Sequence, residues 1–174
     1  KWHLGDADPG NFDVWDGFNS FGGHWQDAKY YGTYKPDNQT DNLIEFMRKH
    51  QGKKEPFIAV NGFYPPHDPY TAPEKYLEMY RNKGIPNPAY YAAVSALDAN
   101  VGRIMKALEE FKLLDNTIVA YFSDHGDTFN YREYSHKFSC YEEAIRVPMI
   151  ISGPGLKDSG RVISEMVGLE DLMP

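Results

Sequence analysis

Cysteine is almost absent from this chain, which has one, Cys140, among 174 residues. A single cysteine excludes an internal disulfide and a zinc site made of several cysteines. Long hydrophobic runs are also lacking. The longest, at 117–122 and 147–151, fall far short of the roughly 20 residues that a spanning helix requires. No membrane span is therefore expected.

Basic residues are fewer than acidic residues in this chain. Lys and Arg number 18 against 25 Asp and Glu, which gives a net charge of −7. This balance argues against a surface that binds nucleic acid, so nucleic acid is not an expected partner. Hydrophobic content of 41% and charged content of 25% are ordinary for a globular protein. The length fits one domain or a large piece of one.

Helix and strand signals alternate along the chain. A helix is predicted over 41–50 with Thr40 as its cap, a second over 73–81, and a long third from Pro88 to about Phe111 after the cap residue Asn87. Apolar runs predict strands at 56–63, 117–122, 147–152 and 162–167. This alternation predicts an α/β sandwich with a mostly parallel or mixed sheet flanked by helices. Ligands of such folds collect at the carboxyl ends of strands.

Polar residues follow the predicted strands, where they could share one site. His67 follows the strand at 56–63, while Asp124 and His125 follow the strand at 117–122 and precede Lys137. An Asp and a His could hold a cation, while lysines and histidines hold a tetrahedral anion and protonate a departing oxygen. This inventory suits sulfuryl or phosphoryl transfer. The alternative is a polar surface turn at 124–127 and a packed loop histidine at position 67.

Aromatic residues are dense in the first part of the chain. They could form a stacking platform for a sugar ring, or they could be a loop that packs on itself. The residues concerned are Trp15, Phe18, Phe21, His24 and Trp25.

Several short motifs, in order and in register, resemble those of the type I sulfatases of the alkaline phosphatase superfamily. The resemblance covers nearly the whole chain. It is carried by Lys1-Trp2-His3-Leu4-Gly5, Pro66-His67-Asp68-Pro69, Leu97-Asp98 through Val101-Gly102, Asn116-Thr117 into Ser123-Asp124-His125-Gly126-Asp127, Lys137, Tyr141-Glu142-Glu143 and Arg146-Val147-Pro148.

The resemblance implies roles for six residues. Lys1, His67 and Lys137 correspond to residues that bind the sulfate group, and His3 to one that supports the nucleophile. His3, His67 and Lys137 are thus the candidate catalytic residues. Asp124 and His125 correspond to a pair that ligates calcium. Because imidazole is not the preferred ligand of Ca²⁺, Mn²⁺ and Zn²⁺ stay as alternatives.

Two features depart from the family pattern. The motif that yields the formylglycine nucleophile is missing, because Cys140 is followed by neither the proline-type residue nor the arginine of that motif. Cys140 is instead expected to be a small buried residue. The stretch 128–135 also lacks the Gly-x-His-Gly that often precedes the lysine.

The chain is therefore predicted to be the middle portion of a single sulfatase catalytic domain over 1–174. We expect it to be truncated at both ends, incomplete at the N-terminal side of the sheet and inactive alone. The expected function of the parent is hydrolysis of sulfuric esters on sulfated carbohydrate, with a formylglycine that this chain does not encode.

Alternative functions are a phosphatase or phosphonate monoester hydrolase of the same superfamily, or a non-catalytic binding protein that retains the fold. The sequence itself does not indicate a compartment. The resemblance implies a periplasmic, lysosomal or secreted protein.

Overall fold

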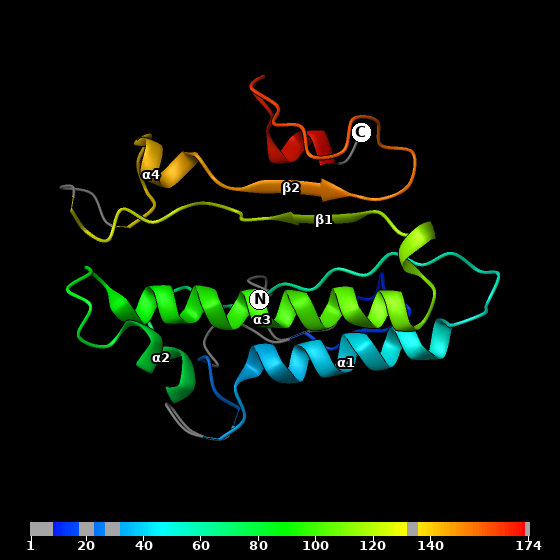
Figure 1. Ribbon diagram of the computed structural model, residues 1–174, viewed down its shortest axis with the longest axis horizontal. Helices are drawn as coiled ribbons and strands as arrows, with labels where there is room; N and C mark the ends of the chain where they lie inside the picture. Colours follow the sequence, from blue (N-terminus) through cyan, green and yellow to red (C-terminus); the bar gives the residue numbers. More distant parts are fainter. Residues whose placement is uncertain (1–8, 18–22, 27–31, 132–135, 173–174) are drawn as a thin grey trace. The chain divides into compact units, whose positions relative to one another are not determined.

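The computed structural model describes residues 9–17, 23–26, 32–131 and 136–172. The chain divides into two compact units, residues 1–113 and residues 114–174. The first is helical and the second contains a small sheet (Figure 1). In the described ranges, no helix has both the length and the apolar character needed to cross a membrane.

The described residues of the first unit contain three α-helices, as the sequence predicts. They are α1 (Lys35–His50), α2 (Glu74–Tyr80) and α3 (Pro88–Glu110), and both α1 and α2 contact α3 (Figure 1). Helix α1 starts earlier than expected because Tyr34 is its cap position and Pro36 fits its first turn. Thr40 is therefore not a cap; it is fully buried within the helix.

Small side chains allow α2 to lie close to α3. Ala92 and Ala93 are fully buried on α3, and with Ala72 they form a cluster against which α2 packs. The α2 residues in this contact are Tyr76, Leu77 and Tyr80. The buried stripe of α3 includes alanines as well as Leu97 and Leu108, whereas Val94 is exposed.

A polar network joins α1 to α3. Asn100 on α3 is only 1% exposed. Its amide donates to Asp37 Oδ1 at 2.7 Å and to the Ala96 carbonyl at 3.0 Å. Its Oδ1 accepts from Arg103 at 3.0 Å, and Arg103 also forms an ion pair with Asp41. A buried amide whose donor and acceptor are both used fixes the pairing of the two helices.

The second unit contains an antiparallel strand pair. Strand β1 (Val119–Phe122) pairs with β2 (Met149–Ser152), with Tyr121 opposite Ile150. The 3-10 helix η2 (Leu114–Asn116) precedes β1, a short helix α4 (Glu142–Ile145) precedes β2, and η3 (Leu169–Leu172) lies near the end. The α/β class is confirmed. Within the described residues the sheet consists of this antiparallel pair.

Two predicted strands are wrong for the described structure. Residues 56–63 and 162–167 form no strand. Ile58 is 92% exposed and Val60 is 80% exposed, so the first run is not buried either. A strand exists only where a neighbour completes its hydrogen bonds, and no described strand pairs with either run. Cys140 is also exposed rather than buried.

Replacing Asn100 tests the polar network between α1 and α3. We expect Asn100→Leu to lower the free energy of unfolding by about 1–3 kcal/mol, because it removes the hydrogen bonds that the buried Asn100 amide makes to Asp37 and Arg103. Urea unfolding of the purified protein measures this. Lys106→Ala, at an exposed position of α3, is the matched control and should change stability by less than about 0.5 kcal/mol. Equal stability of Asn100→Leu and wild type would contradict the role of the network.

Candidate functional site

His67 lies on a proline-rich loop that follows the segment 56–63. Its backbone N–H donates to the Tyr64 carbonyl at 3.2 Å and closes a turn. Its ring Nδ1 lies 2.8 Å from the Asp68 carbonyl oxygen and 3.0 Å from Asp68 Oδ1. Both atoms only accept hydrogen bonds, so Nδ1 carries a proton. The ring is therefore fixed with Nε2 as the atom that can face a ligand.

The loop around His67 is held by the ring of Tyr64 and by Thr71. The Tyr64 ring packs against the His67 ring at 4.9 Å and against the His24 ring at 4.8 Å in an edge-on arrangement. His24 Nδ1 lies 3.0 Å from Thr71 Oγ1, which also accepts from Trp25 Nε1 at 3.3 Å. These contacts join residues far apart in sequence.

The segment just before α1 also holds this loop. Tyr34 Oη donates to the Thr71 carbonyl at 3.3 Å, and an isolated bridge pairs Trp25 with Tyr34. Trp25 also packs against the Tyr34 ring. The loop interpretation of His24 and Trp25 is thus confirmed: both residues pack within the unit. Phe18 and Phe21 lie outside the described residues.

His24 is a buried neutral histidine. It is only 2% exposed, and its Nε2 has no hydrogen-bond partner among the described residues. Burial, reinforced by repulsion from His67, lowers the pKa of His24 to about 4. A neutral ring at this position avoids placing a second positive charge beside His67.

Asp124 and His125 follow β1, at the end of the strand where the sequence placed them. The His125 ring Nδ1 lies 2.8 Å from the Gly126 carbonyl oxygen, which can only accept, so Nδ1 carries the proton. Nε2 of His125 then lies 3.5 Å from Asp124 Oδ2. In the neutral ring both atoms carry lone pairs, so both can serve as ligands of a cation.

This donor pair fits part of a metal site. A histidine held through Nδ1 by a carbonyl group presents Nε2 as a ligand, and a carboxylate oxygen beside it is a second ligand. Among the described residues, no third His, Cys, Asp or Glu joins the pair in ligand geometry. A complete coordination sphere needs further ligands.

Gly126 brings the Asp124–His125 pair against α4. Its N–H donates to the Ala144 carbonyl at 2.7 Å, and a Cβ at position 126 would overlap the backbone oxygen of Glu143. Glycine is needed there for this close approach. The Asp-His-Gly and Tyr-Glu-Glu motifs, separate in sequence, are thus packed together.

Lys137 lies in the second unit, after the loop at 127–130. The lysine is half-buried, and the residue before it, His136, is bonded to Asp127 through the ring. The sequence did not predict the contact between His136 and Asp127, nor the contacts of Thr71. His136 and Asp127 are nine residues apart, and Thr71 is more than forty residues from His24 and Trp25. Contacts at such separations leave no periodic pattern in a single sequence. Lys1 and His3 lie outside the described residues, so their roles stay predictions.

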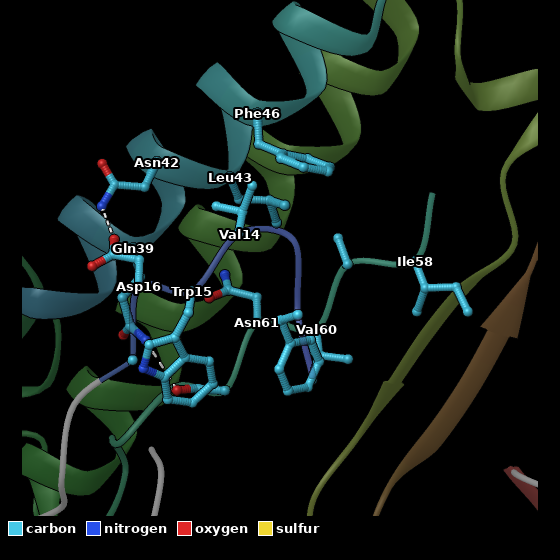
Figure 2. Close-up of a pocket in the computed structure, with 14 residues that line it drawn as sticks. Val14, Trp15, Asp16, Gln39, Asn42, Leu43, Phe46, Ile58, Val60 and Asn61 are labelled. Carbon is cyan, nitrogen blue, oxygen red and sulfur yellow. Dashed lines mark hydrogen bonds between the residues drawn. The ribbon is translucent and has the colours of Figure 1, made fainter. Parts of the chain in front are cut away.

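A pocket of about 270 Å³ lies in the first unit, beside α1 and the segment 58–62 (Figure 2). Val14, Leu43, Phe46 and Val60 contribute an apolar wall, and Trp15 stacks on Phe12 at 5.6 Å. His67 is not among the lining residues. This pocket is therefore separate from the loop that carries the candidate catalytic histidine.

Comparison with known proteins adds the family context. The family model described as "Sulfatase" matches residues 1–174. An ulvan-active sulfatase of Formosa agariphila is 30% identical over 168 residues, covering 85% of this chain and 33% of its own length.

Solved structures show the same likeness. The structure named "putative sulfatase yidJ", from Bacteroides fragilis, has a TM-score of 0.66 and 34% identity, with 71% of this chain and 32% of that chain covered. The structure of Ps i-CgsB in complex with k-i-k-neocarrahexaose has a TM-score of 0.63 and 28% identity, with 72% of this chain and 29% of that chain covered. The chain thus spans about a third of the length of these proteins.

The buried His24 makes a prediction about pH. Its pKa is about 4 in the folded state against 6.5 ordinarily, so below about pH 6.5 the unfolded chain binds a proton that the folded chain does not. The unfolding free energy should fall as pH drops toward about 4, by about 3 kcal/mol from this group. His24→Gln should remove this part of the pH dependence in urea unfolding. An unchanged pH dependence in the variant would contradict a buried neutral His24.

Proposed function

The chain belongs to the sulfatase family, and from this premise we propose that the protein hydrolyses sulfate esters, with sulfated carbohydrates as its substrates. The observation that carries the proposal is the match of the sulfatase family over residues 1–174. The fixed tautomer of His67, on the Pro-His-Asp-Pro motif, supports it independently. The nucleophile, by family resemblance a formylglycine, is not encoded by these residues.

His67 is proposed to act on the leaving oxygen of the ester. When the S–O bond breaks, negative charge develops on that oxygen, and an N–H donor beside it stabilises the transition state. With Nδ1 bonded to Asp68, protonated His67 can donate only through Nε2. The loop therefore lets His67 deliver a proton in a single direction.

Lys137 is proposed to bind the sulfate oxygens that stay on sulfur. An ammonium group offers three donors and a full positive charge to an oxyanion. Lys1 has the same proposed role, and His3 is proposed to support the nucleophile. The net charge of −7 makes local cations important, because a sulfate ester must approach an acidic protein.

Asp124 and His125 are proposed to hold part of a divalent cation site, with Ca²⁺ as the preferred ion. When bound, such an ion supplies positive charge that offsets the charge of the sulfate group. The carboxylate of Asp124 is the ligand that suits Ca²⁺ best, whereas His125 Nε2 suits Mn²⁺ and Zn²⁺ better. The 3.5 Å separation of Oδ2 and Nε2 supports the pair as joint ligands.

Carbohydrate is proposed as the group that carries the sulfate. The support is that a structure similar to this chain contains a neocarrahexaose. The aromatic loop offers less support, because His24 and Trp25 are engaged within the protein.

The activity test uses the full-length protein with its formylglycine formed. We expect release of sulfate from sulfated oligosaccharides and from an aryl sulfate, with a much slower reaction on the corresponding phosphate monoester. His67→Ala should lower kcat by about 100- to 10,000-fold on substrates with a poor leaving group. His50→Gln, on α1, is the matched control and should keep wild-type activity. Absence of sulfate release, or faster release of phosphate, would refute the proposal.

The metal proposal is tested with chelation and Asp124→Asn. We expect exhaustive chelation to abolish turnover and Ca²⁺ to restore it, with Asp124→Asn needing at least about 10-fold more Ca²⁺ because the ligand has lost its charge. Asp115→Asn, on η2 in the same unit, is the control. Full activity after chelation, together with wild-type behaviour of Asp124→Asn, would contradict a metal at this pair. Restoration by Mn²⁺ or Zn²⁺ alone would contradict Ca²⁺ as the ion.

A further inference from the structure

His136 is hydrogen-bonded to the loop at 127–130. Its carbonyl accepts from the Thr128 N–H at 2.6 Å, and its own N–H donates to Asn130 Oδ1 at 3.3 Å. Its ring contacts Asp127 Oδ1 through Nδ1 at 2.9 Å and Asn130 Nδ2 through Nε2 at 2.9 Å. Both backbone polar groups and both ring nitrogens of one residue are therefore used to hold the loop.

The partners determine where the protons of this network lie. The amide Nδ2 of Asn130 can only donate, so Nε2 of His136 accepts and carries no proton. The ring proton is therefore on Nδ1 and is donated to the Asp127 carboxylate. Asp127 Oδ1 also accepts the N–H of Phe129 at 2.8 Å. Exchanging the two atoms of the Asn130 amide would break two bonds at once, so this orientation is the one the loop supports.

The backbone of Asn130 and of His136 adopts a conformation that is unfavourable for residues with a side chain. Asn130 has a φ of 59° and His136 a φ of 39°, in the left-handed region that glycine adopts without cost. Such a conformation costs a residue with a side chain about 1–2 kcal/mol. The side-chain hydrogen bonds of Asn130 and His136 offset this cost and explain why these residues stand where glycine would be easier.

This arrangement sets the direction of the chain at Lys137. The lysine comes directly after His136, so the φ and ψ angles of His136 decide where the Lys137 side chain starts. We propose that His136, held by Asp127 and Asn130, is a positioning residue that aims the Lys137 ammonium at the sulfate group. The proposal rests on the function proposed above. It deepens that function by adding three residues that do not touch the substrate themselves.

A double-mutant cycle with inorganic sulfate as the probe tests the proposal. Calorimetric titration of the full-length protein gives the Kd of sulfate for wild type, His136→Ala, Lys137→Ala and the double variant. We expect each single variant to weaken binding about 10- to 100-fold, the effect of one charge-assisted hydrogen bond. The double variant should be no weaker than Lys137→Ala within about 2-fold, because His136 acts only through Lys137.

Two further variants separate positioning from stability. Asp127→Asn keeps an oxygen that can accept from both His136 and Phe129, so its sulfate affinity should lie between those of wild type and Asp127→Ala. Lys157→Ala, an exposed lysine of the same unit, controls for general loss of positive charge and should bind sulfate as wild type does. Melting temperatures identify any variant that fails to fold. If a variant does, the sulfate affinity of Asp127→Asn relative to wild type decides whether the positioning role holds.

The outcomes distinguish this inference from the proposed function. Additive losses in the cycle, unchanged sulfate affinity in His136→Ala, or no sulfate binding by wild type would each overturn the positioning role. Sulfate binding with a non-additive cycle but no ester hydrolysis would support the positioning role while refuting the proposed sulfatase activity.

Discussion

Three histidines of the described residues, His67, His125 and His136, are each oriented by a nearby oxygen of the same segment, and the assigned chemistry depends on this constraint. The Nδ1 atoms of His67 and His125 lie 2.8 Å from the carbonyl oxygens of Asp68 and Gly126, and Nδ1 of His136 lies 2.9 Å from Asp127 Oδ1. An oxygen that only accepts requires a proton on Nδ1, and the neutral ring then has its lone pair on Nε2. With Nδ1 engaged in this way, Nε2 is the atom that acts in each ring. It can donate a proton in charged His67, ligate a cation in neutral His125, and accept a hydrogen bond from Asn130 in His136.

Contacts between residues far apart in the sequence hold these loops in place. In the first unit, Thr71 receives contacts from His24, Trp25 and Tyr34. Tyr64 then connects His24 with His67 through ring contacts. In the second unit, Gly126 lies against α4 and cannot carry a side chain. The short His-containing motifs therefore depend on specific residues elsewhere in their own unit to hold their side chains in place.

The sequence predicts the local elements well and the long-range pairing less well. Helix α3 and strands β1 and β2 follow from apolar spacing, turn residues and β-branched runs, which act within a few residues. The runs at 56–63 and 162–167 have strand composition, but no described strand pairs with them, and composition cannot supply a partner. Family motifs locate His67, Asp124, His125 and Lys137. The contacts of Thr71 and His136 could not be predicted, because they depend on loop conformations such as the positive φ of Asn130.

A long-range proton–nitrogen NMR spectrum of the full-length protein tests the tautomer constraint most directly, recorded at a pH above the ordinary histidine pKa of about 6.5. This experiment reports which ring nitrogen of a neutral histidine carries the proton. The account predicts that His67, His125 and His136 each have the proton on Nδ1 and a bare Nε2. Protonated Nε2 on His67 and His125, or a rapidly averaged mixture of the two forms, would contradict it.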